Sequence, residues 1–416
     1  MTGNLNVDVS LDTSQRLAES PFTLEWLLQC LASADDKFVA LNKASRVIKI
    51  TGADISEGKG FISQVYDVRI YFDNLDDPYK VILKVPGTES FDKAAKKFEV
   101  DKDGVVHAAY LAALHNVECG FYLNYAPHLN LPLIKVFKAQ EWIVGKQPGA
   151  LLMESMVGKS TQVHFATGAT VGQIYEVAKQ MAHQHHYFLT CPPEQWVGKH
   201  HFALEKFAVD FFTPYMEKVK KLKPGVFDAG IDKFSKYMGV KFAKFTTLDI
   251  REELGLPLVL CHGDMHNNNL LWKVNPDGSA SDELAGIIDW QTMYEGCLTV
   301  DLSKFMCACV DGELRREVED QVLEYYYDTL SKLLKDSGKE VTFGLDQVKK
   351  AYRVNYVSQV FFTLVVGPFI LMCKEWTEEE RPVKQAQFDH FMERARMALE
   401  DGVERLEEIP EDKILR

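Results

Sequence analysis

The chain has 416 residues, of which 46% are hydrophobic and 26% are charged. This length and composition exclude a mainly disordered chain and allow a large core, most simply divided between two lobes. The net charge of −13 argues against nucleic acid as a partner, because phosphate backbones attract basic surfaces.

No secretory or membrane signal is visible in the sequence. The start, MTGNLNVDVSLDTSQ, lacks basic residues followed by an apolar core. The eight cysteines are scattered without a C-x-x-C pair, which favours free thiols in a reducing compartment. The apolar stretch from Val357 to Cys373 is short for a bilayer and is interrupted by polar residues and Gly367-Pro368, so a buried helix is expected there. We therefore expect a cytoplasmic protein with no membrane span.

The N-terminal part alternates helical and strand patterns. Thr23 to Leu31 carries leucines at helical spacing, and strand character begins at Val47. The glycine-bearing turn GKGFIS (residues 58–63) then leads into an alternating strand that ends at Phe72. Such a turn lets backbone N–H groups approach phosphates, which makes Gly60 and Ser63 candidate phosphate contacts. Glycine hairpins are common, so the turn alone is weak evidence.

The next strand, Lys80 to Pro86, carries Lys84 among apolar residues. A buried charge needs a partner. Kinases place a lysine on the corresponding strand to hold the donor's phosphates, and they orient it with a glutamate from the following helix. The alternative is a lysine that extends to solvent from an edge strand.

The middle of the chain is mainly helical. Val171 to His186 reads as a long helix that ends in a histidine cluster, residues 183–186. Adjacent histidines do not share one helix face and no HExxH motif is present, so we do not predict zinc. Residues 196–245 are aromatic and basic, and further helices are expected at Leu314–Tyr327 and Phe388–Leu406.

The most informative stretch is LVLCHGDMHNNNLLWKVNPDGSASDELAGIID, residues 258–289. Apolar runs separated by a Pro-Asp-Gly turn predict a hairpin. That hairpin would bring Asp264, Asn269 and Asp289 to neighbouring strand ends. Phosphoryl transfer from a nucleotide uses one carboxylate to accept the acceptor's proton, with an amide and a second carboxylate to hold Mg²⁺. The kinase pattern has this five-residue Asp–Asn spacing and a later metal-binding Asp. The alternative is a polar turn beside a surface hairpin.

The segment HGDMHNNN (262–269) resembles the HGDxxxxN loop of the aminoglycoside phosphotransferase and choline kinase superfamily. IDWQ (288–291), Gly296 and Asp301-Leu302 are similar to the superfamily's metal-binding segment. The nearest resemblance is to the CHK kinase-like group, the ecdysteroid-kinase-related proteins of nematodes and insects. HNVE (115–118) extends the resemblance over most of the chain, whereas His266 departs from the group, which commonly has Trp there.

The resemblance implies an α+β, bilobal protein-kinase-like fold. A nucleotide-binding lobe with a small antiparallel sheet would span residues 1–154, and a larger, mainly helical catalytic and acceptor-binding lobe would span 155–416. It assigns Glu118 as the partner of Lys84 and Glu154, Ser155 and Met156 as the hinge that contacts adenine. It also implies a packing role for His185 and places acceptor contacts in residues 196–245.

The expected activity is therefore transfer of the γ-phosphoryl group of ATP to a hydroxyl of a small, lipophilic metabolite. Asp264 would be the base, and Asn269 and Asp289 would bind Mg²⁺. Asp301 would brace the catalytic loop through backbone N–H groups. Two alternatives stay open, a choline or ethanolamine kinase and a catalytically silent binding protein of the same fold. The sequence leaves the oligomeric state unknown.

Overall fold

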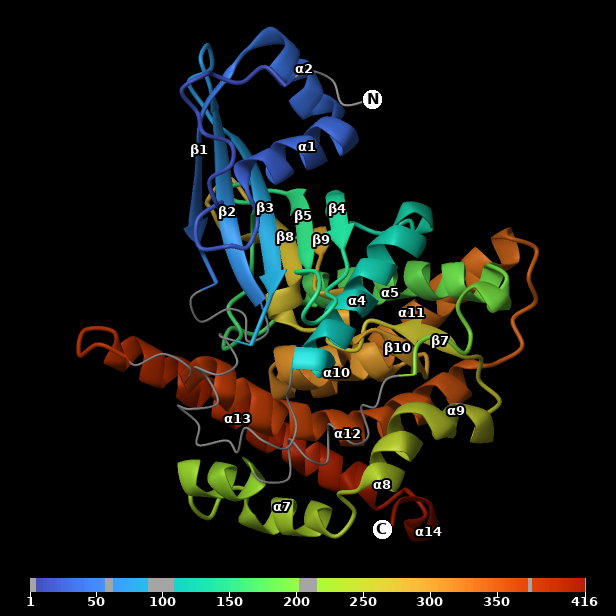
Figure 1. The fold of residues 1–416 in the computed structure, drawn as a ribbon. Helices are drawn as coiled ribbons and strands as arrows, with labels where there is room; N and C mark the ends of the chain where they lie inside the picture. The colour runs from blue at the N-terminus through green and yellow to red at the C-terminus, as the bar shows by residue number, and fades with distance from the viewer. Residues whose placement is uncertain (1–4, 57–62, 89–107, 202–214, 373–375, 416) are drawn as a thin grey trace. The chain divides into compact units, whose positions relative to one another are not determined.

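The computed structural model describes residues 5–56, 63–88, 108–201, 215–372 and 376–415 (Figure 1). The chain forms two compact units. Unit 1 comprises Met1–Pro127 and Ile134–Val157, and unit 2 comprises His128–Leu133 and Gly158–Arg416. The division falls at residue 157, three residues after the predicted lobe boundary, and a short segment before it groups with unit 2.

Unit 1 is built on an antiparallel sheet. In its described residues five strands pair in the order β1-β2-β3-β5-β4. The strands are β1 (Val47–Asp54), β2 (Ser63–Phe72), β3 (Tyr79–Pro86), β4 (Val136–Gln140) and β5 (Ala150–Glu154). The helices of this unit are α1 (Leu24–Ala34), α2 (Asp36–Ala44) and α4 (Ala108–Asn124). This is the predicted small antiparallel sheet.

Helix α1 forms where leucines recur at helical spacing. Thr23 caps it by accepting a hydrogen bond from the N–H of Trp26 at 3.2 Å. Leu27, Leu28 and Leu31 are fully buried, in a core with the apolar faces of β1, β2 and β3. The predicted helix from residue 23 is confirmed, and it continues three residues beyond Leu31.

Strand β3 lies inside the sheet. Lys84 is opposite Val65 on β2 and opposite Leu151 on β5. The alternative of a lysine on an edge strand is therefore wrong, because both sides of β3 are paired where Lys84 stands.

The HNVE motif of α4 fastens that helix to the β4–β5 connection. The Nε2–H of His115 donates to the carbonyl of Gln140 at 2.8 Å. The amide of Asn116 donates to the carbonyl of Trp142 at 3.1 Å and accepts from its N–H at 2.8 Å. These bonds fix the helix that carries Glu118.

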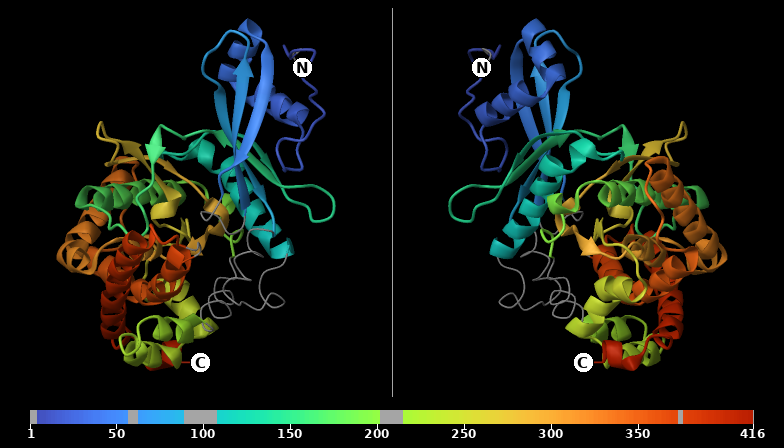
Figure 2. Two further views of the ribbon diagram at one scale, coloured as in Figure 1. Left: turned by 90° about the vertical axis from the view of Figure 1, so that its left-hand side faces the viewer. Right: turned by 90° about the vertical axis from the view of Figure 1, so that its right-hand side faces the viewer.

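Unit 2 is mainly helical, as predicted. Its longer helices are α5 (Val171–Thr190), α10 (Val300–Cys309), α11 (Gly312–Asp336), α12 (Leu345–Met372) and α13 (Arg381–Leu406). Shorter ones are α7 (Asp228–Ser235), α8 (Val240–Lys244), α9 (Ile250–Glu253) and α14 (Glu411–Ile414). Helices α12 and α13, orange and red, lie side by side (Figures 1 and 2). Gly367 permits this, because a Cβ there would be 2.0 Å from the ring of Phe391.

Helix α5 begins with a capping box between Thr170 and Gln173 and runs four residues beyond its predicted end. His185 is fully buried within it, with Nδ1 2.7 Å from the hydroxyl oxygen of Tyr326. This contact agrees with a packing role for His185.

Among the described residues, α12 alone is long and apolar enough to cross a membrane by length and composition. Of its most apolar window, 71% is buried inside the protein. Such burial is typical of a core helix.

Two small antiparallel sheets carry the predicted polar trio. Strand β7 (Val259–Cys261) pairs with β10 (Tyr294–Gly296), and β8 (Leu270–Val274) lies between β6 (Ser160–Thr161) and β9 (Ala280–Ile287). Strands β8 and β9 form the predicted hairpin, with Leu270 opposite Ile287.

Candidate functional site

A buried carboxylate holds the loop that follows β7. Asp301, in the first turn of α10, accepts hydrogen bonds from the N–H groups of His262 at 2.7 Å and Gly263 at 2.9 Å. Burial raises the pKa of the Asp301 carboxyl, and these two hydrogen bonds, with the nearby His262 ring and Lys304 ammonium, lower it again only in part. This is the bracing contact that the sequence predicted.

Gly263 is required by the shape of the same loop. Its φ is +82°, and a Cβ would lie 2.2 Å from the carbonyl oxygen of Thr292. His262 then bridges the loop to the end of β9, since its Nε2–H donates to the carbonyl of Ile288 at 2.9 Å and its Nδ1 accepts from the N–H of Asp264 at 3.2 Å. Burial lowers the pKa of His262, which keeps the ring neutral in this tautomer.

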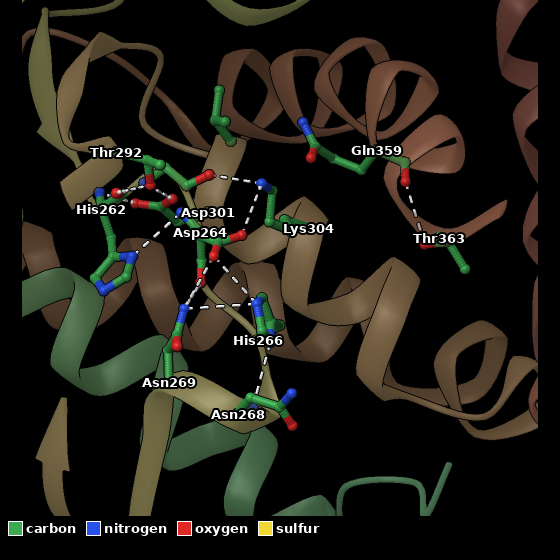
Figure 3. Close-up of polar contacts among 12 residues, drawn as sticks. His262, Asp264, His266, Asn268, Asn269, Thr292, Asp301, Lys304, Gln359 and Thr363 are labelled. Atoms are coloured by element: carbon green, nitrogen blue, oxygen red, sulfur yellow. Dashed lines mark hydrogen bonds and ion pairs between the residues drawn. The ribbon is translucent and has the colours of Figure 1, made fainter. Parts of the chain in front are cut away.

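Asp264 and Asn269 are brought together by their spacing (Figure 3). The amide Nδ2 of Asn269 donates to the Asp264 carbonyl at 2.8 Å and to its carboxylate Oδ2 at 3.1 Å. The amide oxygen of Asn269 points away from the carboxylate in Figure 3 and has no hydrogen-bond partner among the described residues.

Asp289 follows β9 beside Asn269. The N–H of Ile288 donates to the carbonyl of Asn269 at 3.0 Å, which places the two residues at neighbouring strand ends. Asp289 has the left-handed backbone angles φ 68° and ψ 56°. This conformation costs a non-glycine residue of order 1–2 kcal/mol, and such strain is concentrated at functional sites.

An imidazole and an ammonium group, those of His266 and Lys304, flank the Asp264 carboxylate. His266 Nε2 lies 3.2 Å from Oδ2, and the Lys304 ammonium lies 3.6 Å from Oδ1 (Figure 3). Because His266 Nδ1 accepts from the N–H of Asn268 at 3.3 Å, its proton is on Nε2 and points to Asp264. Burial raises the pKa of Asp264, but His266 and Lys304 more than offset it, and the pKa lies well below its usual range.

Neither flanking residue was assigned a role from the sequence. Lys304 follows Asp301 by three residues, and helix positions three apart lie on one face. That spacing was the signal that could have placed Lys304 beside the loop that Asp301 holds.

The predicted phosphate-binding lysine of unit 1 has its predicted partner. Lys84 Nζ lies 2.7 Å from Glu118 Oε2, and their side chains are only 12% and 2% exposed. Ser63 is buried at the start of β2, opposite Pro86. Gly60 lies outside the described residues.

The predicted hinge residues follow β5. The N–H of Glu154 donates to the carbonyl of Lys135 at 2.9 Å, and its Oε1 accepts from the Lys135 N–H at 2.9 Å. Ser155 Oγ accepts from the N–H of Val157 at 3.3 Å. The backbone N–H of Glu154 is therefore already paired within unit 1.

Within the described ranges, no group of three or more His, Cys, Asp or Glu side chains could hold a metal by itself. Magnesium is usually bound by one or two protein ligands together with waters and substrate phosphates. Asp289 and Asn269 fit a magnesium site of this kind, in which the protein supplies two ligands and water and phosphate supply the rest.

These features define a protein with the kinase-like fold, and solved structures agree. The chain is similar to choline kinase from Cryptosporidium parvum, with a TM-score of 0.52 and 11% identity over 92% of this chain and 98% of that one. The predicted fold is thereby confirmed.

The chain belongs to the DUF1679 family, whose model is described as "Uncharacterized oxidoreductase dhs-27" and matches residues 42–408. The Caenorhabditis elegans protein of that name is 30% identical over 77% of this chain. The match covers only 40% of that relative's length. The "Uncharacterized kinase-like protein D1044.1" of the same organism is 20% identical over 77% of this chain and 83% of its own length. The finer assignment to the CHK kinase-like group stays a prediction.

Proposed function

We propose that the chain is an ATP-dependent phosphotransferase that moves the γ-phosphoryl group to a hydroxyl of a small molecule. The observation that carries this proposal is the pairing of Asn269 with the Asp264 carboxylate, at the base of the hairpin that ends on Asp289. A polar surface turn would need no buried aspartate to hold its backbone, whereas this loop is held by Asp301.

The donor set fits a magnesium–nucleotide complex. The Asn269 amide oxygen is directed away from Asp264, and Asp289 adds a carboxylate from a neighbouring strand end. Oxygen ligands of this kind are those that Mg²⁺ prefers. A bound magnesium ion would neutralise charge on the transferring phosphoryl group.

In this proposal Asp264 orients the acceptor hydroxyl and accepts its proton. Its lowered pKa keeps the carboxylate ionised at neutral pH, so it can accept a hydrogen bond, but it also makes a weak base. Positioning of the hydroxyl would therefore contribute more to the rate than proton abstraction. Lys84, oriented by Glu118, would hold the donor's phosphates.

The smaller assignments follow the same reasoning. Unit 1 would bind the nucleotide, with Gly60 and Ser63 near the phosphates and residues Glu154 to Met156 at the adenine. The acceptor would be a hydroxylated, lipophilic metabolite, as in the CHK kinase-like group that the sequence resembles. A catalytically silent protein would have no need of the Lys84–Glu118 pair together with the strained Asp289.

An oxidoreductase is not favoured, despite the name that the family model carries. Dinucleotide-binding oxidoreductase folds use a parallel sheet with a glycine-rich turn at its carboxyl edge. Every pairing between the named strands of the described residues is antiparallel. The relative with that name is matched over 40% of its length, and its activity as a whole protein need not belong to the matched part.

The test is release of ADP from Mg-ATP by purified protein over a panel of hydroxylated metabolites. We expect acceptor-dependent release by the unmodified chain and loss of about two orders of magnitude or more in Asp264→Ala. Asp328→Asn, an exposed change on α11, is the matched control and should leave the rate unchanged. A fully active Asp264→Ala enzyme would refute the assignment of the base.

A further inference from the structure

The Lys304 side chain lies beside the Asp264 carboxylate. Its ammonium donates to the carbonyl of Gly263 at 2.6 Å and lies 3.6 Å from Asp264 Oδ1. The same nitrogen lies over the ring of Phe362 on α12, 4.2 Å from the ring centroid. The side chain is only 9% exposed, so this charge is held in place rather than solvated.

One aromatic ring, that of Phe362, contacts the Lys304 ammonium, and two further rings continue from it. His266 lies against Phe362 with ring centroids 5.4 Å apart, and Phe165 packs edge-to-face with His266 with centroids 5.6 Å apart. We call Phe165, His266 and Phe362 the aromatic group. All three are buried, and together with Asp264 they supply ring faces and a carboxylate.

Ring faces beside a carboxylate are the means by which proteins hold ammonium head-groups. In this chain one such ring face and the carboxylate already hold a cation, the side chain of Lys304. Repulsion from the Lys304 ammonium alone would disfavour a second cation about 5 Å from it by roughly a hundredfold at an effective dielectric constant of about 20, and the attraction of the Asp264 carboxylate offsets part of that penalty.

We propose that Lys304 is a specificity-determining residue that excludes cationic acceptors, so that the acceptor is neutral or anionic near its reacting hydroxyl. This inference rests on the proposed phosphotransfer and narrows its substrate class. It sets the chain apart from choline- and ethanolamine-type kinases, whose acceptors carry an ammonium group.

The alternative is a purely structural role, in which Lys304 only connects α10 to the catalytic loop through its hydrogen bond to the Gly263 carbonyl. Replacing a purely structural lysine would lower stability and leave the choice between cationic and uncharged ligands beside Asp264 as it was. The two explanations therefore differ in the ligand preference of the Lys304 variants, and tetramethylammonium tests that preference without an identified acceptor.

The experiment is an NMR titration of the full chain with tetramethylammonium. Lys304→Ala removes both the charge and the bulk, and Lys304→Met removes the charge while filling the space. Lys236→Ala is the matched control, because Lys236 also lies over an aromatic ring, Tyr237 at 4.5 Å, with a carboxylate partner, but on the exposed surface.

We expect Lys304→Ala to bind tetramethylammonium at least about tenfold more tightly than the unmodified chain, Lys304→Met or Lys236→Ala. Equal binding by the unmodified chain and Lys304→Ala would overturn the proposal. Failure of folded Lys304→Ala to bind the cation would also overturn it, because the aromatic group would then be no cation site.

Turnover provides a second measurement that does not depend on the alanine variant folding. Choline and its uncharged isostere 3,3-dimethylbutan-1-ol are compared as acceptors for ADP release. The unmodified chain should favour the uncharged alcohol by about tenfold or more, and Lys304→Met should narrow that gap. Choline used as well as its isostere would overturn the inference but leave the phosphotransfer proposal intact. If neither alcohol supports ADP release, the result counts against the phosphotransfer proposal. The tetramethylammonium titration would still decide the cation site.

Discussion

Removing the Asp301 carboxylate should loosen the loop that carries Asp264. Asp301 is completely buried, and its two oxygens accept the N–H groups of His262 and Gly263 at 2.7 and 2.9 Å. Each hydrogen bond to a charged group contributes about 1.5–3 kcal/mol, which sets an upper limit of about 3–6 kcal/mol for the pair. Burial has raised the pKa of this carboxyl, which indicates that desolvation of the charge cancels part of that gain.

We therefore expect Asp301→Ala to lower the free energy of unfolding by about 3–5 kcal/mol, and Asp301→Asn by about 1–3 kcal/mol because one amide oxygen remains to accept. Urea unfolding followed by circular dichroism at neutral pH measures both. Asp328→Asn, exposed on α11, is the control and should change stability by less than about 0.5 kcal/mol. If Asp301→Ala behaved like that control, the bracing role would be wrong.

Three further predictions concern other parts of the chain. Lys84→Met should weaken Mg-ATP binding by about tenfold to a hundredfold, because a charge-assisted bond to phosphate is lost, whereas Lys80→Met, at an exposed position four residues earlier on the same strand, should not; equal effects in a calorimetric titration would contradict the assignment. Burial lowers the pKa of His185 to about 3, below the unfolded value of about 6.5, so stability is kept above that unfolded value and lost as the pH falls toward the folded one. The loss should be about 2 kcal/mol at about pH 5, and a His185→Gln variant with the same pH dependence of urea unfolding would refute it. Gly263→Ala should destabilise by about 2 kcal/mol more than Gly145→Ala, since both have positive φ but only the first Cβ would meet a carbonyl oxygen, at 2.2 Å; equal urea midpoints would show that the loop can relax.

The local elements of the site were predictable because their signals are local. The turn between β8 and β9 and the five-residue spacing of Asp264 and Asn269 are fixed by neighbouring residues, and the structure has both. The Lys84–Glu118 pair joins residues 34 apart in the chain, yet it was predicted because the resemblance supplied the partner.

The surroundings of Asp264 were not predictable in the same way. Phe362 reaches Lys304 and His266 from α12, about a hundred residues away from the loop, and no periodicity within α12 indicates what its buried face meets. His266 was noted only as a departure from a related group, and its contact with Asp264 depends on a ring orientation that the N–H of Asn268 fixes. Helix α5 continues to Thr190, four residues beyond its predicted end at His186. The histidine cluster contains no glycine, proline or other residue that ends a helix, so it does not mark a terminus.

The most direct test of the central claim is the unfolding temperature with ATP in the presence and absence of Mg²⁺, for the unmodified chain and for Asp289→Ala. We expect the unfolding temperature to rise only when both ligands are present, by the equivalent of about 2.7 kcal/mol of stabilisation when ATP is at about 100 times its Kd, and we expect that rise to be lost in Asp289→Ala. An unmodified chain that Mg-ATP does not stabilise, or an Asp289→Ala chain stabilised as much as the unmodified one, would contradict it.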